Sequence, residues 1–321
     1  MATLGVIANA AARDGSPSDG DMYYQSDLQQ IILYDDSLSA WKEYTPAGAP
    51  YDLDGTNVMT VTPNFHFDAS KINGVDATGN PSNAASFTGI WTSRTNGVVT
   101  IAQATGSLQP TFYTSGTNSK PYLSVDGDYC PISPFTDKFF ATDELTFFVV
   151  AEKLSGGNLP FFGSAGAAQN ATFLNYGTNG KDYLFYLQTG ASNAKDRASI
   201  DGSEATYETT RMYLMTRDSS DNGDVFVDGN NQNALLASTF TGPVIANFMN
   251  DTVGTYPMPS DGLCGIGRQG NWDGKGHIYE IAMWNSNLST ADRNKLITYV
   301  NTKYGDGRNA ADSGTFDRVP F

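Results

Sequence analysis

Short segments in which apolar and polar residues alternate follow one another along most of the chain, with Gly, Asn, Ser and Pro between them. Alternation of period two, bounded by such turn residues, is typical of half-buried β-strands. From residue 65 onward the strand candidates include FHFDA, GVVTIA, PYLSV, LPFFG, ATFLNYG, DYLFYLQ, GDVFVDG and HIYEIAMWN. We therefore expect an all-β fold of the sandwich or barrel class.

Two local patterns indicate how such strands are buried. The segment LTFFVVA, residues 145–151, is apolar throughout, which is typical of a central strand that is covered on both faces. In FHFDA, His66 lies between Phe65 and Phe67, so its side chain is expected on the face opposite to theirs. We therefore predict that residues 145–151 form a central strand of a sheet.

A helical pattern occurs in LSTADRNKLITYVNTKYG, after the last strand candidate. Ser289 is the expected N-cap, and Asp292 stands three residues later, where a capping box has its acidic residue. Gly305 is the expected C-terminal stop. Residues at helical spacing form one apolar face: Leu296, Ile297, Val300 and Tyr304. We predict one amphipathic helix that packs on the sandwich.

The N-terminal segment predicts a separate meander of three short strands, MYYQ, QIILY and AWKEY. Strands of this length cannot cover their own apolar face, so we expect it to be buried against the sandwich, a sister chain or a particle surface. The expected contact residues are Tyr23, Tyr24, Ile31, Leu33 and Trp41. The expected boundaries are 1–50 for the meander, 51–63 for a linker, 64–306 for the sandwich and 307–321 for a tail.

Charge and cysteine content narrow the partners and the redox chemistry. The formal charge is −15, from 19 Lys and Arg against 34 Asp and Glu, with no basic cluster. Phosphate backbones and anionic lipid would repel such a chain, so neither nucleic acid nor a membrane is an expected partner. Cys130 and Cys264 form no disulfide framework, and two separate buried thiols or a single bridge both fit the sequence.

The segment GHIYEIAMWNSNLSTADRNKLITYVNTKYG, residues 276–305, resembles the ending of the concanavalin A-like, laminin-G-like jelly-roll superfamily. FHFDAS, KPYLSVDGDY, LTFFVVAE and GDVFVDG precede it in the order that this superfamily shows. The resemblance implies a two-sheet antiparallel jelly-roll sandwich with one C-terminal helix. Glu280 falls where the family pattern has an acid, and we expect it to be a hydrogen-bonding structural residue.

The segment SPSDGDMYYQSDLQQIILYDDSLSAWKEY is similar to small meanders of bacteriophage fibre and capsid-associated proteins. This resemblance implies a non-enzymatic virion protein of a tailed phage, a capsid decoration or short fibre subunit. Such a protein would be made in the host cytoplasm, form a homotrimer on the virion surface and contact the major capsid protein. A glycan-binding host-recognition module is the alternative, and a polysaccharide-degrading enzyme ranks below both.

Catalytic motifs do not stand out. Sandwich glycosidases of the resembling fold carry E-x-D-x-x-E, which places a nucleophile and an acid on one strand face, and the sequence lacks it. Asp126 and Asp128, and likewise Asp224 and Asp228, flank glycine-containing turns, where Asp commonly caps the backbone. We therefore predict no catalytic residue. His66 and His277 lack the local partners of a metal site.

Calcium is the remaining candidate for a bound ion, and no other cofactor is expected. DSSDNGD, residues 218–224, concentrates oxygen ligands in Asp218, Asp221 and Asp224, and DLDGTN does so less densely. The alternative is that DSSDNGD is only a hairpin turn between TTRMYLMTR and DVFVDG.

Glycan binding has candidates in two loops. RQGNWDGKGH, residues 268–277, combines an aromatic platform with hydrogen-bonding groups. The candidates in it are Arg268, Asn271, Trp272 and Asp273. IWTSRTNG offers Trp91 and Arg94. The alternative is that Trp272 only covers the rim of the sandwich.

Overall fold

A computed structural model covers residues 1–321 and forms two units, residues 1–51 with 60–62, and residues 52–59 with 63–321. The described residues are 5–7, 22–25, 30–35, 40–43, 51–95, 99–128, 130–133, 144–154, 162–164, 169–176, 181–189, 194–201, 210–217, 223–228, 230–231, 264–266, 268–269, 272–273 and 275–305. Each unit is treated by itself below.

The N-terminal unit contains a four-stranded sheet in the order β1-β2-β3-β4. Its strands are β1 (Gly5–Ile7), β2 (Met22–Gln25), β3 (Gln30–Asp35) and β4 (Ala40–Glu43). β2, β3 and β4 are antiparallel and lie in the three predicted segments, whereas β1 adds a parallel neighbour to β2 that the sequence did not predict. Tyr23 is half-buried. The side chains of the other predicted contact residues lie outside the described part: Tyr24, Ile31, Leu33 and Trp41.

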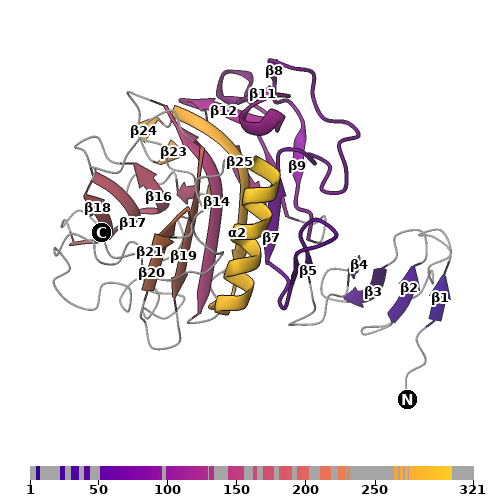
Figure 1. Ribbon diagram of the computed structural model, residues 1–321. Coiled ribbons are helices and arrows are strands. Elements are labelled where there is room, and N and C mark those ends of the chain that lie inside the picture. Colours follow the sequence, from indigo (N-terminus) through magenta and orange to yellow (C-terminus); the bar gives the residue numbers. More distant parts are fainter. Residues whose placement is uncertain are drawn as a thin grey trace. The chain divides into compact units, whose positions relative to one another are not determined.

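The larger unit contains a nine-stranded sheet in the order β21-β20-β19-β14-β25-β12-β11-β8, with β7 beside β25 (Figure 1). Its strands are β7 (Phe65–Asp68), β8 (Ala85–Ser86), β11 (Thr111–Tyr113), β12 (Tyr122–Asp126), β14 (Leu145–Lys153), β19 (Thr210–Arg217), β20 (Gly223–Val227), β21 (Asn230–Asn231) and β25 (Lys275–Trp284). All the pairings are antiparallel. One edge of β25 pairs with β14, and the other is shared by β12 and β7.

A second sheet of eight strands has the order β18-β17-β16-β15-β22-β13-β10-β9. Its strands are β9 (Ile90–Thr92), β10 (Thr100–Ala102), β13 (Cys130–Ser133), β15 (Phe162–Ser164), β16 (Gln169–Tyr176), β17 (Lys181–Thr189), β18 (Ala194–Asp201) and β22 (Cys264–Ile266). Further strands are β5 (Tyr51–Asp52), β6 (Val58–Met59), β23 (Arg268–Gln269) and β24 (Trp272–Asp273). The predicted all-β class with antiparallel sheets is confirmed.

The core between the sheets is built from in-register rows. Phe65, Met283, Phe147 and Met215 lie opposite one another across β7, β25, β14 and β19, and each is at most 1% exposed. From the same face, Phe67 packs edge-on against Trp91 of the second sheet, with ring centroids 5.5 Å apart. Residues 145–151 of β14 are all buried, which confirms the predicted central strand.

Helix α2 (Thr290–Tyr304) lies along the outer face of the nine-stranded sheet (Figure 1). The Ser289 hydroxyl accepts a hydrogen bond from the Asp292 amide, and Gly305 ends the helix in the left-handed conformation, so both predicted ends are confirmed. The predicted apolar face is buried: Leu296, Ile297, Val300 and Tyr304. Among the described residues, no helix has the length and apolar composition that crossing a bilayer needs.

The two cysteines lie in adjacent strands of the second sheet. Cys130 in β13 is a free, buried thiol, and burial raises its pKa. It lies opposite Ile266 of β22 rather than opposite Cys264. Of the two alternatives that the sequence left open, the structure has the separate thiol.

Candidate functional site

The first residues of β25 belong to a row of polar side chains on the outer face of the nine-stranded sheet. Directly opposite residues of neighbouring strands share a face. The register aligns five such residues across β11, β12, β25, β14 and β19: Thr111, Ser124, His277, Glu152 and Thr210. We call them the polar row. Thr210 is buried and the others are half-buried, and β25 extends here beyond the end of α2 (Figure 1).

Two ion pairs lie within and beside the polar row. Nδ1 of His277 is 3.1 Å from Oε2 of Glu152, and the two side chains are 18% and 16% exposed. Lys275 precedes His277 by two residues in β25, and its Nζ lies 3.2 Å from Oδ2 of Asp126 in β12. The carboxylate of Glu152 therefore fixes the orientation of the imidazole ring, while the second pair is open to solvent.

Three rings form a stack over the same strands. The rings of Tyr113 and Tyr122 are stacked, 5.0 Å apart with 13° between their planes. The ring of His277 lies 4.2 Å from that of Tyr122 and is tilted by 39° against it. Tyr122 is thus between the other two, and Tyr113 ends the stack on the side of β8. Burial raises the pKa of Tyr122, and Tyr279 and Tyr113 add to this shift. Its hydroxyl therefore remains a hydrogen-bond donor at neutral pH.

The loop with the 3-10 turn Thr117–Ser119 connects this surface with the end of α2. Oγ1 of Thr117 lies 2.5 Å from Oγ1 of Thr210, and the Thr117 amide donates to the Tyr279 hydroxyl at 3.2 Å. Nδ2 of Asn118 donates to the carbonyl of Lys303 in the last helical turn, at 2.9 Å. The loop therefore holds the end of the polar row at Thr210 in contact with the end of α2.

The backbone of this loop is strained. Asn118 and Ser119 have φ angles of +50° and +57°, a region that residues other than glycine rarely adopt. At Gly116 a Cβ atom would lie 2.5 Å from the hydroxyl of Tyr279 and 2.6 Å from the ring of Tyr122. Such strain persists only where the surroundings enforce it, and it clusters at functional sites.

A second group of ionisable side chains is buried under α2, and we call it the buried cluster. Nε2 of His66 lies 3.1 Å from Oε2 of Glu280, and neither side chain is exposed. Oε1 of Glu280 accepts hydrogen bonds from the hydroxyls of Tyr299 and Tyr304, each at 2.7 Å, and from Nζ of Lys303. This arrangement agrees with the expectation that Glu280 is a hydrogen-bonding structural residue.

Asp68 completes the buried cluster from β7. Nζ of Lys303 lies 2.8 Å and NH1 of Arg94 3.6 Å from Oδ2 of Asp68. Burial acts to raise the pKa of Glu280, but Lys303 and His66 outweigh it and hold this pKa well below its usual value. Burial lowers the pKa of His66, against the opposing effect of Glu280. The cluster attaches α2 to two strands. Its carboxylates and His66 are buried, while Arg94 and Lys303 are 10% and 13% exposed and already contact Asp68.

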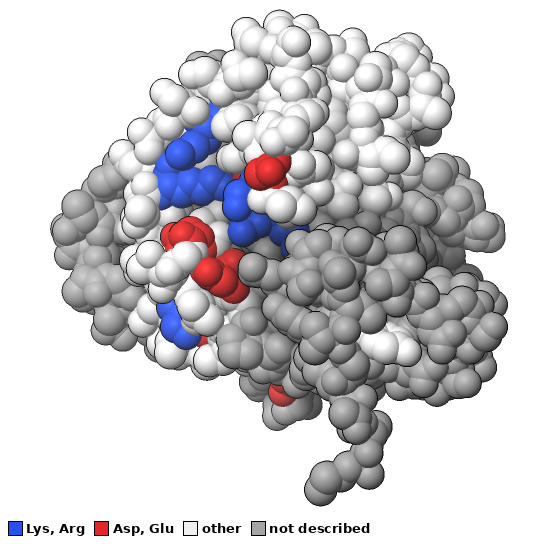
Figure 2. Space-filling view, turned by 90° about the vertical axis from the view of Figure 1, so that its right-hand side faces the viewer, with Lys and Arg blue, Asp and Glu red and all other residues white. Residues whose placement is uncertain are grey.

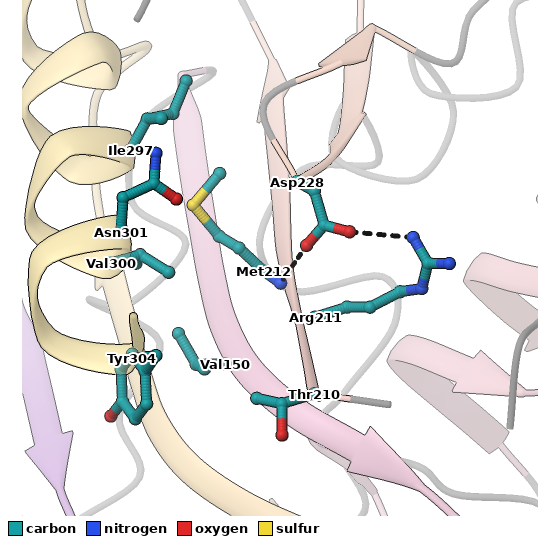
Figure 3. Close-up of a pocket in the computed structure, with 9 residues that line it drawn as sticks. All are labelled: Val150, Thr210, Arg211, Met212, Asp228, Ile297, Val300, Asn301 and Tyr304. Atoms are coloured by element: carbon teal, nitrogen blue, oxygen red, sulfur yellow. Dashed lines mark hydrogen bonds and ion pairs between the residues drawn. The ribbon is translucent and has the colours of Figure 1, made fainter. Parts of the chain in front are cut away.

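A small cavity lies between α2 and strands β14 and β19 (Figure 3). Asp228 accepts hydrogen bonds there from the Met212 amide at 2.9 Å and from Arg211 at 2.8 Å. The cavity has a volume of about 10 Å³, which is roughly the room for one water molecule and too little for an organic ligand. Its lining is Val150, Thr210, Arg211, Met212, Asp228, Ile297, Val300, Asn301 and Tyr304.

The glycan-binding residues predicted in RQGNWDGKGH lie on the hairpin of β23 and β24. Arg268 lies opposite Asp273 in the pairing of these strands, and Gln269 opposite Trp272. Asn271 and the side chains of the other three lie outside the described residues. β24 ends two residues before β25 begins, so the hairpin leads directly to Lys275 and the polar row.

The expectation that Trp91 and Arg94 offer a glycan platform is wrong. Trp91 is fully buried between the sheets, and its Nε1 donates to the carbonyl of Asp68 at 3.1 Å. Arg94 belongs to the buried cluster. Ile90, Trp91 and Thr92 are exposed, buried and half-buried. The sequence does not show which of the two apolar neighbours faces inward.

The aspartates considered for calcium and catalysis have local roles where they are described. Asp128 accepts from the Asp126 amide at 3.0 Å. In DLDGTN, Asp52 and Asp54 accept from backbone amides two and three residues ahead. Asp218 and Asp221 lie outside the described residues, and Asp224 is in β20, whose pairing with β19 gives the predicted hairpin. No metal-binding group of three His, Cys, Asp or Glu occurs among the described residues.

Charge is mixed on the face shown in Figure 2. Lys and Arg atoms lie next to Asp and Glu atoms in one band, and much of the remaining described surface in this view is uncharged. The net charge of −15 is therefore not accompanied by a large acidic or basic patch on the described part of this face.

No protein-family model and no curated protein matches the sequence. Among solved structures, the chain is similar to a sialidase from Trypanosoma rangeli, with 12% identity and a TM-score of 0.43 over 90% of this chain and 46% of the sialidase. It is also similar to domain 4 of AbnA, an arabinanase from Geobacillus stearothermophilus, in complex with arabinotriose. The identity is 12% and the TM-score 0.40, over 71% of this chain and 94% of that domain. The chain spans less than half of the sialidase.

These structures correct two expectations from the sequence. Neither structure is a virion protein, so the interpretation as a structural protein of a tailed phage is contradicted. The expectation that the chain is not an enzyme is contradicted as well, because sialidases are enzymes. Carbohydrate recognition, the alternative that the sequence offered, agrees better with these proteins than the virion interpretation does.

Proposed function

We propose that the protein binds carbohydrate on the outer face of the nine-stranded sheet, at the ring stack and the polar row. The observation that carries this proposal is the half-exposed stack of Tyr113, Tyr122 and His277 beside the carboxylate of Glu152. Saccharides are recognised by an aromatic surface for their C–H faces and by fixed polar groups for their hydroxyls. Both kinds of group are present here.

Each residue has a distinct role in this proposal. Tyr113 ends the stack, and its outer ring face receives a sugar ring. The hydroxyls of Tyr122 and Ser124 and the carboxylate of Glu152 bind sugar hydroxyls, since these groups provide donors and acceptors. The strained loop around Thr117 keeps Tyr122 in place.

The predicted residues on the β23–β24 hairpin extend this surface in our proposal. The hairpin runs into β25 at Lys275, next to the polar row. Trp272 would then contact a second sugar unit, with Arg268 and Asp273 beside it. A jelly-roll connection of the two sheets is the finer fold that we propose with it.

The test is a binding screen on immobilised polysaccharides, followed by calorimetry with the best ligand. Tyr113→Ala should weaken binding at least about tenfold, because truncating an aromatic contact residue commonly costs more than 1 kcal/mol. Tyr113→Phe is the matched control, which keeps the ring and should bind within about threefold of the natural chain. Reducing ends are measured in parallel to detect cleavage. If the natural chain binds no polysaccharide, the proposal is wrong.

A further inference from the structure

We infer that the saccharide recognised at this surface is uncharged. The inference rests on the proposed function and adds the substrate class to it. The inference follows from the charged groups around the stack. They are arranged in pairs, so few positively charged groups remain for an anionic sugar to bind.

The ammonium group of Lys275, beside the polar row, and the imidazole of His277, within it, each already have a carboxylate partner. Lys275 is 3.2 Å from Asp126, and His277 is 3.1 Å from Glu152. A sialic acid or a uronate is held by charge-assisted hydrogen bonds from a cation that is free to turn toward it. To bind one here, Lys275 or His277 would have to leave its partner and expose a carboxylate to the ligand's negative charge.

Other charged side chains near the stack do not add an excess of positive charge. Asp128 adds a third carboxylate beside Asp126, and burial raises its pKa. Lys120 adds a second ammonium group two residues before Tyr122. Among the described side chains, three carboxylates therefore accompany two ammonium groups and the imidazole of His277. The chain as a whole carries −15, which repels an approaching polyanion.

The uncharged groups of the surface suit neutral hydroxyls. Thr111, Ser124 and Tyr122 carry hydroxyls that both donate and accept, as sugar hydroxyls do. They lie on the same sheet face as the stack. A neutral hexose or pentose polymer can therefore satisfy them without breaking an ion pair.

The first experiment compares two groups of probes on the full chain. The neutral group is arabinan, xylan, galactan and mannan, and the anionic group is polygalacturonate and a sialylated oligosaccharide. We expect at least one neutral probe to bind at least about tenfold more tightly than every anionic probe. Its Kd should change less than about twofold between about 50 mM and about 500 mM NaCl, because salt screens only charge-dependent binding.

A second experiment uses the ion pairs themselves. Asp126→Asn combined with Glu152→Gln releases Lys275 and His277, so this variant should gain measurable affinity for polygalacturonate. Lys275→Gln is the matched control and should leave the Kd for the neutral probe within about threefold.

The outcomes separate the two proposals. If the natural chain prefers an anionic probe and Lys275→Gln abolishes that preference, this inference is overturned while carbohydrate binding stands. If no probe of either group binds, both proposals are wrong. Preference for a neutral probe, lost in Tyr113→Ala, supports both.

Discussion

The larger unit contains two His–Glu pairs with the same separation in different environments, one through Nε2 and one through Nδ1 of the imidazole. In the buried cluster, His66 and Glu280 are 3.1 Å apart and neither is exposed. On the polar row, His277 and Glu152 are also 3.1 Å apart, but 18% and 16% exposed. Glu280 and His277 even belong to the same strand, on the same face of the sheet.

Burial, rather than distance, separates the roles of the two pairs. A buried carboxylate loses its hydration and must be compensated by several partners, which Glu280 finds in Lys303, Tyr299 and Tyr304. These partners come from α2, so the pair serves the attachment of the helix. The half-exposed pair keeps contact with water and with any ligand that replaces water. The same two residue types thus serve stability in one place and, in our proposal, binding in the other.

The strongest test of this contrast is Glu280→Gln. Removing the charge leaves Lys303 with Asp68 as its one remaining carboxylate in the cluster, and removing one partner of a buried ion pair costs about 3–5 kcal/mol. The free energy of unfolding should fall by that amount in urea titrations followed by the fluorescence of buried Trp91 and Trp284. A loss below about 1 kcal/mol would contradict the assignment of this cluster to stability.

Tyr304→Phe removes one hydroxyl that donates to Glu280 at 2.7 Å. Hydrogen bonds to charged groups contribute about 1.5–3 kcal/mol, so the free energy of unfolding should fall by that amount. Tyr113→Phe on the stack is the control and should change it by less than about 0.5 kcal/mol. An equal fall in the free energy of unfolding for both variants would contradict the distinction between the buried cluster and the ring stack.

Acidification should destabilise the protein through His66. Its pKa in the folded state is lowered from 6.5, so below pH 6.5 the unfolded chain binds a proton that the folded chain does not. Stability should then fall with pH by up to about 1.4 kcal/mol per unit until the folded-state pKa is reached. Glu280, whose pKa is also lowered, adds a loss of the same sign below pH 4.5.

Urea titrations between pH 7 and pH 5 measure this dependence. His66→Gln should flatten this pH dependence because the titrating group is gone. An unchanged slope in His66→Gln would show that the dependence arises elsewhere.

The smallest effect on stability is expected for Glu152→Gln. Half-exposed ion pairs contribute about 1 kcal/mol or less, so the free energy of unfolding should change little. Saccharide binding, measured by calorimetry, should nevertheless weaken, because an acceptor is lost and the ring of His277 is no longer held. A variant that bound normally would remove Glu152 from the proposed site.

Local features of the fold could be predicted from the sequence because they depend on neighbouring residues. Ser289 and Gly305 end the helix through contacts within one turn, and the position of His66 opposite Phe65 and Phe67 follows from the alternation of a strand. The burial of residues 145–151 follows from their composition. These predictions needed no knowledge of which strands pair.

The candidate site could not be predicted, because it depends on register. Glu152 and His277 are distant in the sequence, and only the pairing of β14 with β25 brings them together. Alternation alone also places His277 and Glu280 on opposite faces, since they are three residues apart. An irregularity at Val150 and Ala151 shifts the register and turns both to the outer face. Tyr113 and Tyr122 likewise meet only through the pairing of β11 with β12.

The position of β25 has a consequence for how the chain folds during synthesis. This strand lies in the middle of its sheet, between β14 on one edge and β12 and β7 on the other, yet along the chain it is the last strand described. Until the ribosome has released residues 275–284, β7, β12 and β14 lack the neighbour that joins them. Pairings over such sequence separations form slowly, and open strand edges are prone to aggregation. Chaperones that shield those edges should therefore raise the yield of folded protein.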